Sequence, residues 1–372
     1  MKSLIPLSKV ALYLLITILF LYGVIVAKQF LYPLAFGALA AYLLYPIVNF
    51  LEKHSFPRIL AILSSIILAL TVIGVTFFLF YQQLINMFAD FDTLRQNANN
   101  NIELLQANLQ NLLGLEDNSV EKFLKTQVNQ FFAGESGGFQ NLFSTTTGTI
   151  FKFILLPIYV FLFLYYRTKF AYFILKIVHK KRKPTAIKIL RDISTVAARY
   201  MGGVSIVVFI LCILNSTGLL IIGVEYAILL GIISAFFNFI PYFGTLMGGA
   251  VPMIFVLLAT DKPLHYAIQV FILFVIIQFI ENNILTPNIV GGNVKINPFF
   301  IIIGLVVGGM IWGIPGMLVI VPFLAILRII FHHIDRLLPF AYLLGPGGTR
   351  KHSITMHKIK HVFSFRKKKE NS

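Results

Sequence analysis

Long apolar runs separated by short polar stretches make up most of this chain, from near its start to about residue 331. Many of these runs reach about 18 residues or more, which as a helix is enough to cross the hydrocarbon core of a membrane. A hydrophobic content of 58% with only 12% charged residues agrees with this pattern. The pattern predicts an all-α polytopic membrane protein with about eight membrane segments and a helical arm outside the membrane.

Polar stretches divide the chain into six parts. The predicted parts are N-terminal membrane spans at 1–81, an extracytoplasmic helical hairpin arm at 82–149, a fourth span at 150–166, a cytoplasmic basic amphipathic linker at 167–201, a transport core at 202–331 and a basic cytoplasmic tail at 332–372. We interpret the first apolar run, Val10 to Ala27, as a retained span, because it is long and no small-residue cleavage pattern follows it.

Charge predicts the orientation of these parts. Residues 82–149 contain seven acidic and three basic residues, whereas 167–199 contain ten basic residues and one acidic residue, Asp192. By the positive-inside rule the first segment faces out and the second lies in the cytoplasm, with both termini. The net charge of +17 comes largely from residues that flank membrane segments, so it predicts contact with anionic lipids and not with nucleic acid.

The outer segment has the pattern of an amphipathic hairpin. Apolar residues at alternating steps of three and four predict one helix that extends the third span, and Asn118 with Glu121 resembles a capping box that opens a second helix. Two interpretations stay open. The hairpin covers its own apolar stripe, or it contacts another subunit in a homo-oligomer. The first stripe comprises Leu84, Phe88, Phe91, Leu94, Ala98, Ile102, Leu105, Leu109 and Leu112, and the second Phe123, Leu124, Val128 and Phe131.

Two segments of the predicted core, Tyr226 to Ala259 and Pro298 to Phe331, are too long for one straight crossing. As straight helices they would measure about 50 Å, against a hydrocarbon core of about 30 Å. Either both cross the membrane, giving eight crossings, or both turn back, giving six. Hairpins are favoured, because two interrupted hairpins that each follow a continuous span form an inverted pair suited to alternating access.

Proline and glycine mark where these segments break, since proline removes a backbone donor and glycine loosens the turn. Backbone groups freed at membrane depth must face protein, water or a solute, so two matched breaks predict a polar cavity. A kink sealed by neighbouring helices is the alternative. The candidate break and hinge residues are Pro241, Gly244, Pro287, Pro298, Gly313, Pro315 and Gly316.

One acidic residue, Glu281, lies within an apolar segment of the core, whereas Glu225 and Asp261 lie near segment ends. An acid at this depth could exchange a proton or hold a cation, so Glu281 is the candidate coupling residue. The amides of Gln278, Asn282 and Asn238 are candidate donors and acceptors for a polar solute. Alternatively, Glu281 staples a helix end near the interface, because it lies only six residues before Pro287.

Spaced motifs occur between residues 195 and 331. They are Arg199 to Gly202, Ile240 to Gly244 with Pro252, Glu281 to Pro287, Gly291, Pro298, and Gly313 to Gly316 with Pro322. As a set they resemble the signature of the autoinducer-2 exporter-like permease family. The resemblance implies a bacterial inner-membrane permease, associated in this family with export of the signal autoinducer-2, a small polyhydroxylated furanone, and in some members with exchange of sodium or lithium for protons. Thr245, Gly203 and Asn288 depart from the usual pattern.

Enzymatic readings find little support. Gly134 to Gly138 matches G-x-S-x-G, but it lies in a polar segment without histidine, and the chain has no Walker A loop or H-E-x-x-H pair. No cofactor is predicted, and His332–His333 without further ligands predicts no metal site.

Three hypotheses follow. The first is a secondary transporter of a small polar solute such as autoinducer-2, coupled to protons or sodium through Glu281. The second is an antiporter of sodium or lithium against protons. The third is an oligomeric membrane scaffold that transports nothing.

Overall fold

The computed structural model describes residues 7–113, 119–132, 146–291 and 296–347. These residues are almost entirely helical and contain no strand. Six stretches are long and apolar enough to cross a membrane, which confirms an all-α polytopic membrane protein. They are Lys28–Lys53, Arg58–Met87, Leu155–Ile177, Lys180–Ile222, Pro263–Val290 and Ile314–His332.

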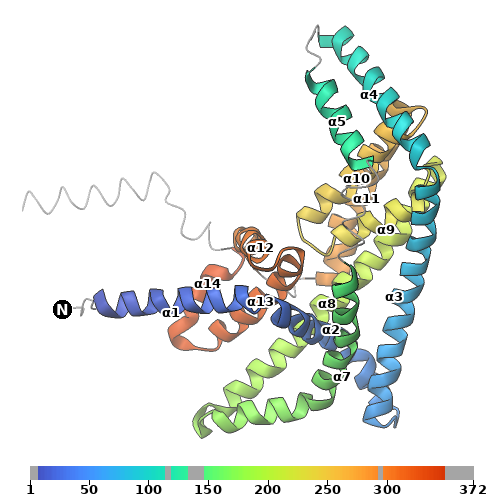
Figure 1. Cartoon of the computed structure of the whole chain (residues 1–372). Coiled ribbons are helices and arrows are strands. Elements are labelled where there is room, and N and C mark those ends of the chain that lie inside the picture. Colours follow the sequence, from blue (N-terminus) through green and yellow to red (C-terminus); the bar gives the residue numbers. More distant parts are fainter. Residues whose placement is uncertain (1–6, 114–118, 133–145, 292–295, 348–372) are drawn as a thin grey trace, which may run out of the picture.

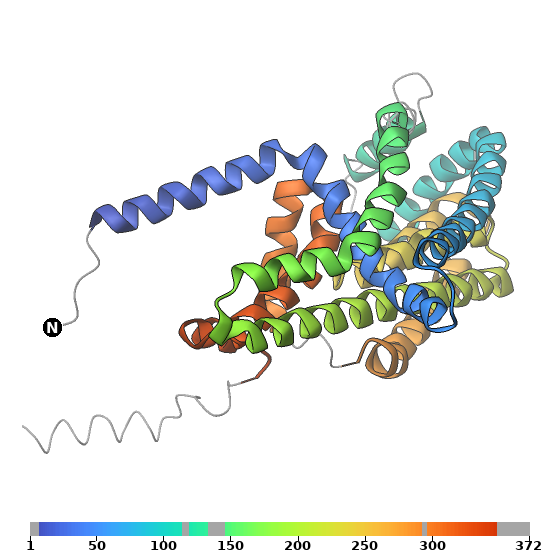
Figure 2. The ribbon, with the colours of Figure 1, turned by 90° about the horizontal axis from the view of Figure 1, so that it is seen from below.

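Helix α1 (Leu7–Val26) projects sideways from the other helices (Figures 1 and 2). Most of its described side chains are exposed and apolar, which suits a surface surrounded by lipid. Its last turn is fixed by the indole of Trp312, whose Nε1 donates a hydrogen bond to the carbonyl oxygen of Val24 at 3.2 Å. The long first span predicted from Val10 to Ala27 is thus a helix that contacts the fold mainly at its C-terminal end.

Helices α2 (Lys28–Lys53), α3 (Arg58–Ala89) and α7 (Thr146–Ile177) pack around one apolar core. Val48, Ala61 and Ile62 are fully buried there, and Leu164 of α7 is nearly so. The connection between α2 and α3 and the C-terminal half of α7 carry basic residues, among them Lys53, Arg58 and Arg167. We therefore call this the basic end of the molecule. The opposite end, which carries the acidic segment, is the arm end.

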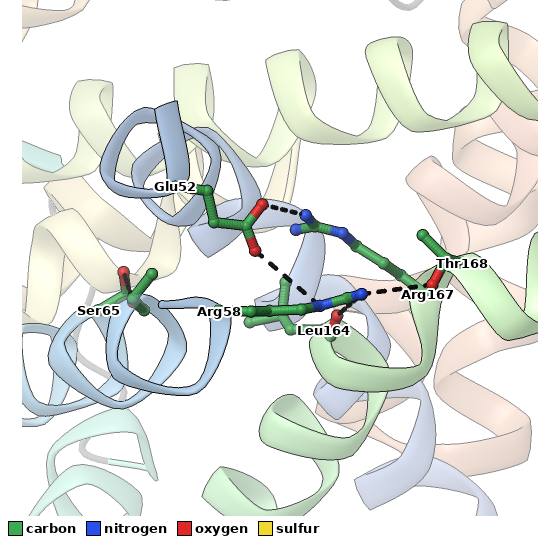
Figure 3. A network of polar contacts seen from close by, with 7 residues as sticks. Glu52, Arg58, Ser65, Leu164, Arg167 and Thr168 are labelled. Atoms are coloured by element: carbon green, nitrogen blue, oxygen red, sulfur yellow. Dashed lines mark hydrogen bonds and ion pairs between the residues drawn. The ribbon is translucent and has the colours of Figure 1, made fainter. Parts of the chain in front are cut away.

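An ionic network closes the three helices at the basic end (Figure 3). Arg167 of α7 donates to the Glu52 carboxylate of α2, and Arg58 at the start of α3 lies 3.9 Å from the other carboxylate oxygen. Arg58 Nη2 also donates to the carbonyl oxygen of Leu164 at 2.8 Å. One carboxylate therefore holds two guanidinium groups that come from different helices.

We expect Glu52→Gln to destabilise the folded protein, because it leaves two partly buried guanidinium groups without a counter-ion. The cost should be about 2 kcal/mol, less than for a fully buried pair because the side chains keep some solvent contact. Thermal unfolding in detergent measures it. Glu103→Gln is the matched control, since its ion pair with Lys125 is exposed and should contribute no more than about 1 kcal/mol. Equal unfolding midpoints for the two variants would contradict this role of Glu52.

The arm is built from α4 (Phe91–Leu113) and α5 (Ser119–Phe132), which fold against each other beyond the end of α3 (Figure 1). A turn at Asp90 separates α3 from α4, so the predicted continuous helix is interrupted once. Ala98 and Ile102 of α4 are buried against Val128 of α5 and against Leu258 of α10 (Phe243–Ala259). The hairpin therefore covers part of its own stripe, while Phe123 and Leu124 stay exposed. Asn118 of the predicted capping box lies outside the described residues.

Helix α8 (Lys183–Ile222) is one continuous helix of 40 residues, about 60 Å long. It follows a short 3₁₀ turn, η1 (Lys180–Arg182), and begins with Pro184 in its first turn. It ends at Gly223, whose φ of 86° is left-handed. The helix runs through the predicted boundary at 201/202, so the basic linker and the first core span form a single rigid element.

Both long core segments fold back on themselves. In the first, α9 (Ala227–Phe237) and α10 (Phe243–Ala259) are antiparallel, with Gly248 beside Ser234. In the second, α12 (Pro298–Trp312) and α13 (Ile314–His332) are antiparallel, with Gly308 beside Gly316. The hairpin arrangement favoured from the sequence is the one observed, and we call these the first and second hairpins.

The two hairpins enter the molecule from opposite ends. The first hairpin begins at Tyr226, which is bonded to Asp90 at the arm end. The second ends at His333, which lies 3.3 Å from Asp192 in the basic half of α8. Beyond it, η4 (Asp335–Leu337) and α14 (Leu338–Leu344) fold back so that the carbonyl oxygen of Leu344 accepts from Asn297 at the start of α12. This is the inverted pair that the sequence predicts.

Candidate functional site

Glu281 lies where α11 (Pro263–Ile280) widens into a π-helix, η2 (Glu281–Val290). Its side chain is buried, with 9% of the residue exposed, whereas Glu225 and Asp261 are exposed at the arm end. A π-helical turn shifts the register of side chains and often accompanies a functional site. The structure therefore places one buried carboxylate in the core, at the point where the helix changes its pitch.

Three amides predicted from the sequence gather around this carboxylate. Asn238, at the tip of the first hairpin, donates to Glu281 Oε2 at 3.2 Å. Gln278 Nε2 donates to the same oxygen at 3.1 Å and to Asn282 Oδ1 at 3.2 Å. Two donors thus converge on one carboxylate oxygen, while the other, Oε1, has no hydrogen bond from a described residue. This arrangement connects the tip of the first hairpin to α11.

A pocket opens beside these residues, between α8, the first hairpin and α11. It has an empty volume of about 230 Å³ when its open mouth is counted, and its enclosed part has room for about one water molecule. The polar residues that line it are Asn215, Ser234, Asn238, Thr245, Gln278 and Glu281.

Three of these lining residues were not among the candidates predicted from the sequence. Asn215 of α8 is 2% exposed, and its Oδ1 has no hydrogen-bond partner in the described part of the chain. Ser234 donates to the carbonyl oxygen of Leu230, and Thr245 donates to that of Tyr242, each at 2.7 Å. A polar residue inside each apolar segment was the available signal, but only the packing of α8 against α9 and α10 shows that they face one pocket.

The first hairpin closes tightly just beside the pocket. A methyl group on Gly244 would overlap the backbone of Phe237 and Asn238, so only glycine allows α10 to start this close to the end of α9. Tyr242, in the connection, has a left-handed φ of 64°, which is strained for a residue with a side chain. The tip is therefore held in one compact conformation that places Asn238 on Glu281.

The second hairpin has the same sequence signature but does not line this pocket. Gly313 turns its tip with a φ of 68°, and Pro315 and Gly316 begin α13. Its interruption is closed by direct backbone contact between Gly308 and Gly316. A pocket thus lies beside the first break, whereas at the second break the backbones of the two hairpin helices meet directly.

The remaining candidates do not line the pocket. Pro287 is within η2 and Pro298 begins α12, whose N-cap residue Asn297 accepts from the backbone N–H of Phe299. Pro241 is in the tip of the first hairpin. Within the described residues no group of three histidine, cysteine or acidic side chains could hold a metal ion. His333 Nε2 instead lies 3.3 Å from a carboxylate oxygen of Asp192. The G-x-S-x-G segment at 134–138 lies outside the described residues.

The model of one known protein family, described as AI-2E family transporter, matches residues 14–336. This chain belongs to that family. Among relatives, the "Putative transport protein YrrI" of Bacillus subtilis is 29% identical over 324 residues, covering 84% of this chain and 89% of YrrI. The "Putative transport protein YueF" of the same organism is 26% identical, with 82% and 85% covered. The "Putative transport protein YhhT" of Escherichia coli K12 is 29% identical over 130 residues, 35% of this chain and 37% of YhhT.

As an AI-2E family member with membrane-spanning helices, the chain is a multi-pass membrane transport protein and not an enzyme. The match to the family agrees with the resemblance carried by the hairpin motifs.

Proposed function

We propose that this chain is a secondary transporter that carries a small polar solute through the pocket beside Glu281, coupled to protons or sodium by alternating access. The observation that carries the proposal is the buried carboxylate at the hairpin tip, with one oxygen bonded to Asn238 and Gln278 and the other free. An acid placed in a membrane segment is expensive to bury, and in transport proteins such residues mark ion and solute pathways.

The hydrogen-bonding inventory of the pocket supports a guest that donates hydrogen bonds or carries positive charge. The hydroxyl groups of Ser234 and Thr245 both donate their hydrogen bonds to backbone carbonyl oxygens. The amide of Asn238 donates one of its two N–H groups to Glu281, and the amide of Gln278 donates one to Glu281 and one to Asn282. What remains for a guest is acceptor capacity at Glu281 Oε1, Asn215 Oδ1 and the two hydroxyl oxygens, beside a smaller number of N–H donors on the amides of Asn215 and Asn238. Protons, small cations and polyhydroxylated solutes such as the furanone autoinducer-2 fit this inventory.

The inverted hairpins supply a route for alternating access. Each enters from its own end of the molecule, and the pocket lies at the tip of the first hairpin, between that hairpin, α8 and α11. In our proposal, the tip carrying Asn238 separates from Glu281 when the carboxylate binds a proton or a cation. Exchange of partners at one carboxylate would then couple ion movement to solute movement.

A second candidate is an antiporter of sodium or lithium against protons. It is favoured by the size of the pocket, whose enclosed part holds about one water molecule and therefore suits a bare or partly hydrated cation. In this variant, Glu281 binds the cation and the proton alternately, and no organic solute crosses.

Flux into proteoliposomes distinguishes these proposals. Purified full-length protein is reconstituted, a pH gradient is imposed, and uptake of an autoinducer-2 furanone is compared with uptake of sodium. We expect one of the two to move at least about tenfold faster than in protein-free vesicles, and to slow when the gradient is collapsed. Furanone movement supports the solute transporter and sodium movement alone supports the antiporter. Absence of both fluxes at every gradient would contradict the proposed function.

A further inference from the structure

The arm makes a set of contacts with the first hairpin that transport through the pocket does not by itself require. Asn101 of α4 donates two hydrogen bonds from its Nδ2 atom, to the carbonyl oxygens of Leu258 and Thr260, both at 2.9 Å. One turn earlier on α4, Asn97 Nδ2 donates to the carbonyl oxygen of Ala259 at 3.1 Å. Three consecutive carbonyl groups at the end of α10 are thus bonded by two side chains of another helix.

These carbonyl groups need such partners. The last four carbonyl groups of a helix have no intrahelical donor, and in an apolar setting an unpaired carbonyl is costly. Asn101 is only 4% exposed, so water does not readily replace its bonds. Beside it, Leu258 packs against the buried core of the arm formed by Ala98, Ile102 and Val128. The end of α10 is therefore capped and packed by the arm.

The other foot of the first hairpin is bonded to the same region. Tyr226, which precedes α9, donates from its hydroxyl to Asp90 Oδ2 at 2.6 Å, and Asp90 is the turn residue between α3 and α4. Tyr226 has a left-handed φ of 54°, a conformation that needs support from its surroundings. Residues 90 to 101 thus hold both ends of the first hairpin, while the hairpin's tip lies on Glu281.

We propose that Asn97, Asn101 and Asp90 form a clamp that fixes the outer ends of the first hairpin and thereby positions its tip against Glu281. The clamp makes the arm a positioning element for the pocket. Its consequence for flux rests on the proposed transport function, but its consequence for the structure of the tip does not.

The hairpin can transmit such positioning because its two helices are locked together. Helix α10 has 17 residues and is about 25 Å long. A methyl group on Gly244 would overlap the backbone of α9, and one on Gly248 would lie 3.0 Å from the carbonyl oxygen of Ser234, so the two helices are closely packed. A displacement at the clamp therefore moves the pair as one body. The tip bears Asn238, whose contact with Glu281 at 3.2 Å tolerates little displacement.

The test uses full-length protein in lipid nanodiscs and compares Asn101→Asp with Asn100→Asp. Asn100 is an exposed neighbour on the same helix, so its variant has the same charge and composition without touching the clamp. Asn101→Asp replaces both donated bonds with repulsion between the carboxylate and the carbonyl oxygens. We expect amide hydrogen exchange at residues 256–260 to rise about tenfold in Asn101→Asp and to stay unchanged in Asn100→Asp.

The position of the hairpin tip is measured separately, by the rate of maleimide labelling of Thr245→Cys in a Cys212→Ser background. Thr245 suits this purpose because it lines the pocket and is exposed. We expect Asn101→Asp to change the labelling rate at least about threefold. Tyr226→Phe, which removes only the bond to Asp90, should change it in the same direction. Faster exchange at 256–260 with unchanged labelling in both variants would mean a local cap only and would overturn the clamp. Neither measurement needs a transported solute. A changed labelling rate would therefore support the clamp even if the flux experiment contradicted the proposed transport function.

Discussion

Glu281→Gln is expected to abolish the dependence of flux on the imposed pH gradient and to lower the coupled rate more than about tenfold. Glutamine has nearly the same shape and keeps an oxygen that can accept from Asn238 and Gln278. It cannot release a proton or neutralise a bound cation at any physiological pH. The variant therefore removes the proposed coupling chemistry while leaving the tip contact largely in place. Initial rates in proteoliposomes across a series of imposed gradients measure it.

Glu225→Gln is the matched control, because Glu225 is an exposed acid just before the first hairpin and does not line the pocket. Its flux should equal that of the wild type at every gradient. If the Glu281→Gln protein kept the flux and the gradient dependence of the wild type, the transport pathway would not use this pocket. A scaffold that transports nothing predicts no flux in either variant or in the wild type.

The hairpins and the central acid could be predicted because their signals are local. Proline and glycine interrupt a helix wherever they occur, and two apolar segments of 34 residues cannot cross as straight helices. A single carboxylate within an apolar segment stands out in the same way, and Gln278 lies one helical turn from it. Asn238 was predicted because it precedes the break at Pro241, and the fold then places it on Glu281.

Contacts between distant segments could not be predicted from these signals. Asn215 looks like an isolated polar residue in α8, and only the rotation of α8 against α9 turns it toward the pocket. Asn101 is one of several asparagines in a row, and the sequence does not show which of them faces α10. Glu52 and Arg167 are 115 residues apart, so their pairing depends on how α2 meets α7.

The second hairpin shows the limit of a motif as evidence for a site. Its glycines and prolines match those of the first, yet Gly304, Gly308 and Gly316 serve close packing between α12 and α13. The first hairpin uses its glycines in the same way but adds Ser234, Asn238 and Thr245, whose polar groups line the pocket. Polar residues beside the break, more than the break itself, distinguish a break that borders a pocket from a break that is closed by packing.

Gly316→Ala is expected to destabilise the second hairpin strongly, although alanine is ordinarily the better helix former. A methyl group at Gly316 would overlap the carbonyl oxygen of Gly308, and a methyl group at Gly308 would lie 2.7 Å from the carbonyl oxygen of Gly316. Because both neighbours are backbone atoms, α12 and α13 must move apart. Overpacking of this kind costs about 3 kcal/mol, which exceeds the gain of about 1 kcal/mol from helix propensity. Thermal unfolding followed by size-exclusion chromatography in detergent measures the loss.

Gly74→Ala is the matched control, since Gly74 lies inside α3 with nothing within 4 Å of the position that a methyl group would take. Only the propensity gain applies there, so its unfolding midpoint should equal or exceed that of the wild type. Gly304→Ala should fall between the two, because its neighbours are the flexible side chains of Leu324 and Ile320, which can rotate away. The expected order of stability is therefore Gly74→Ala, then Gly304→Ala, then Gly316→Ala, because the added methyl group meets open space, flexible side chains and backbone atoms in turn. A Gly316→Ala protein as stable as the Gly74→Ala protein would show that α12 and α13 do not cross in backbone contact.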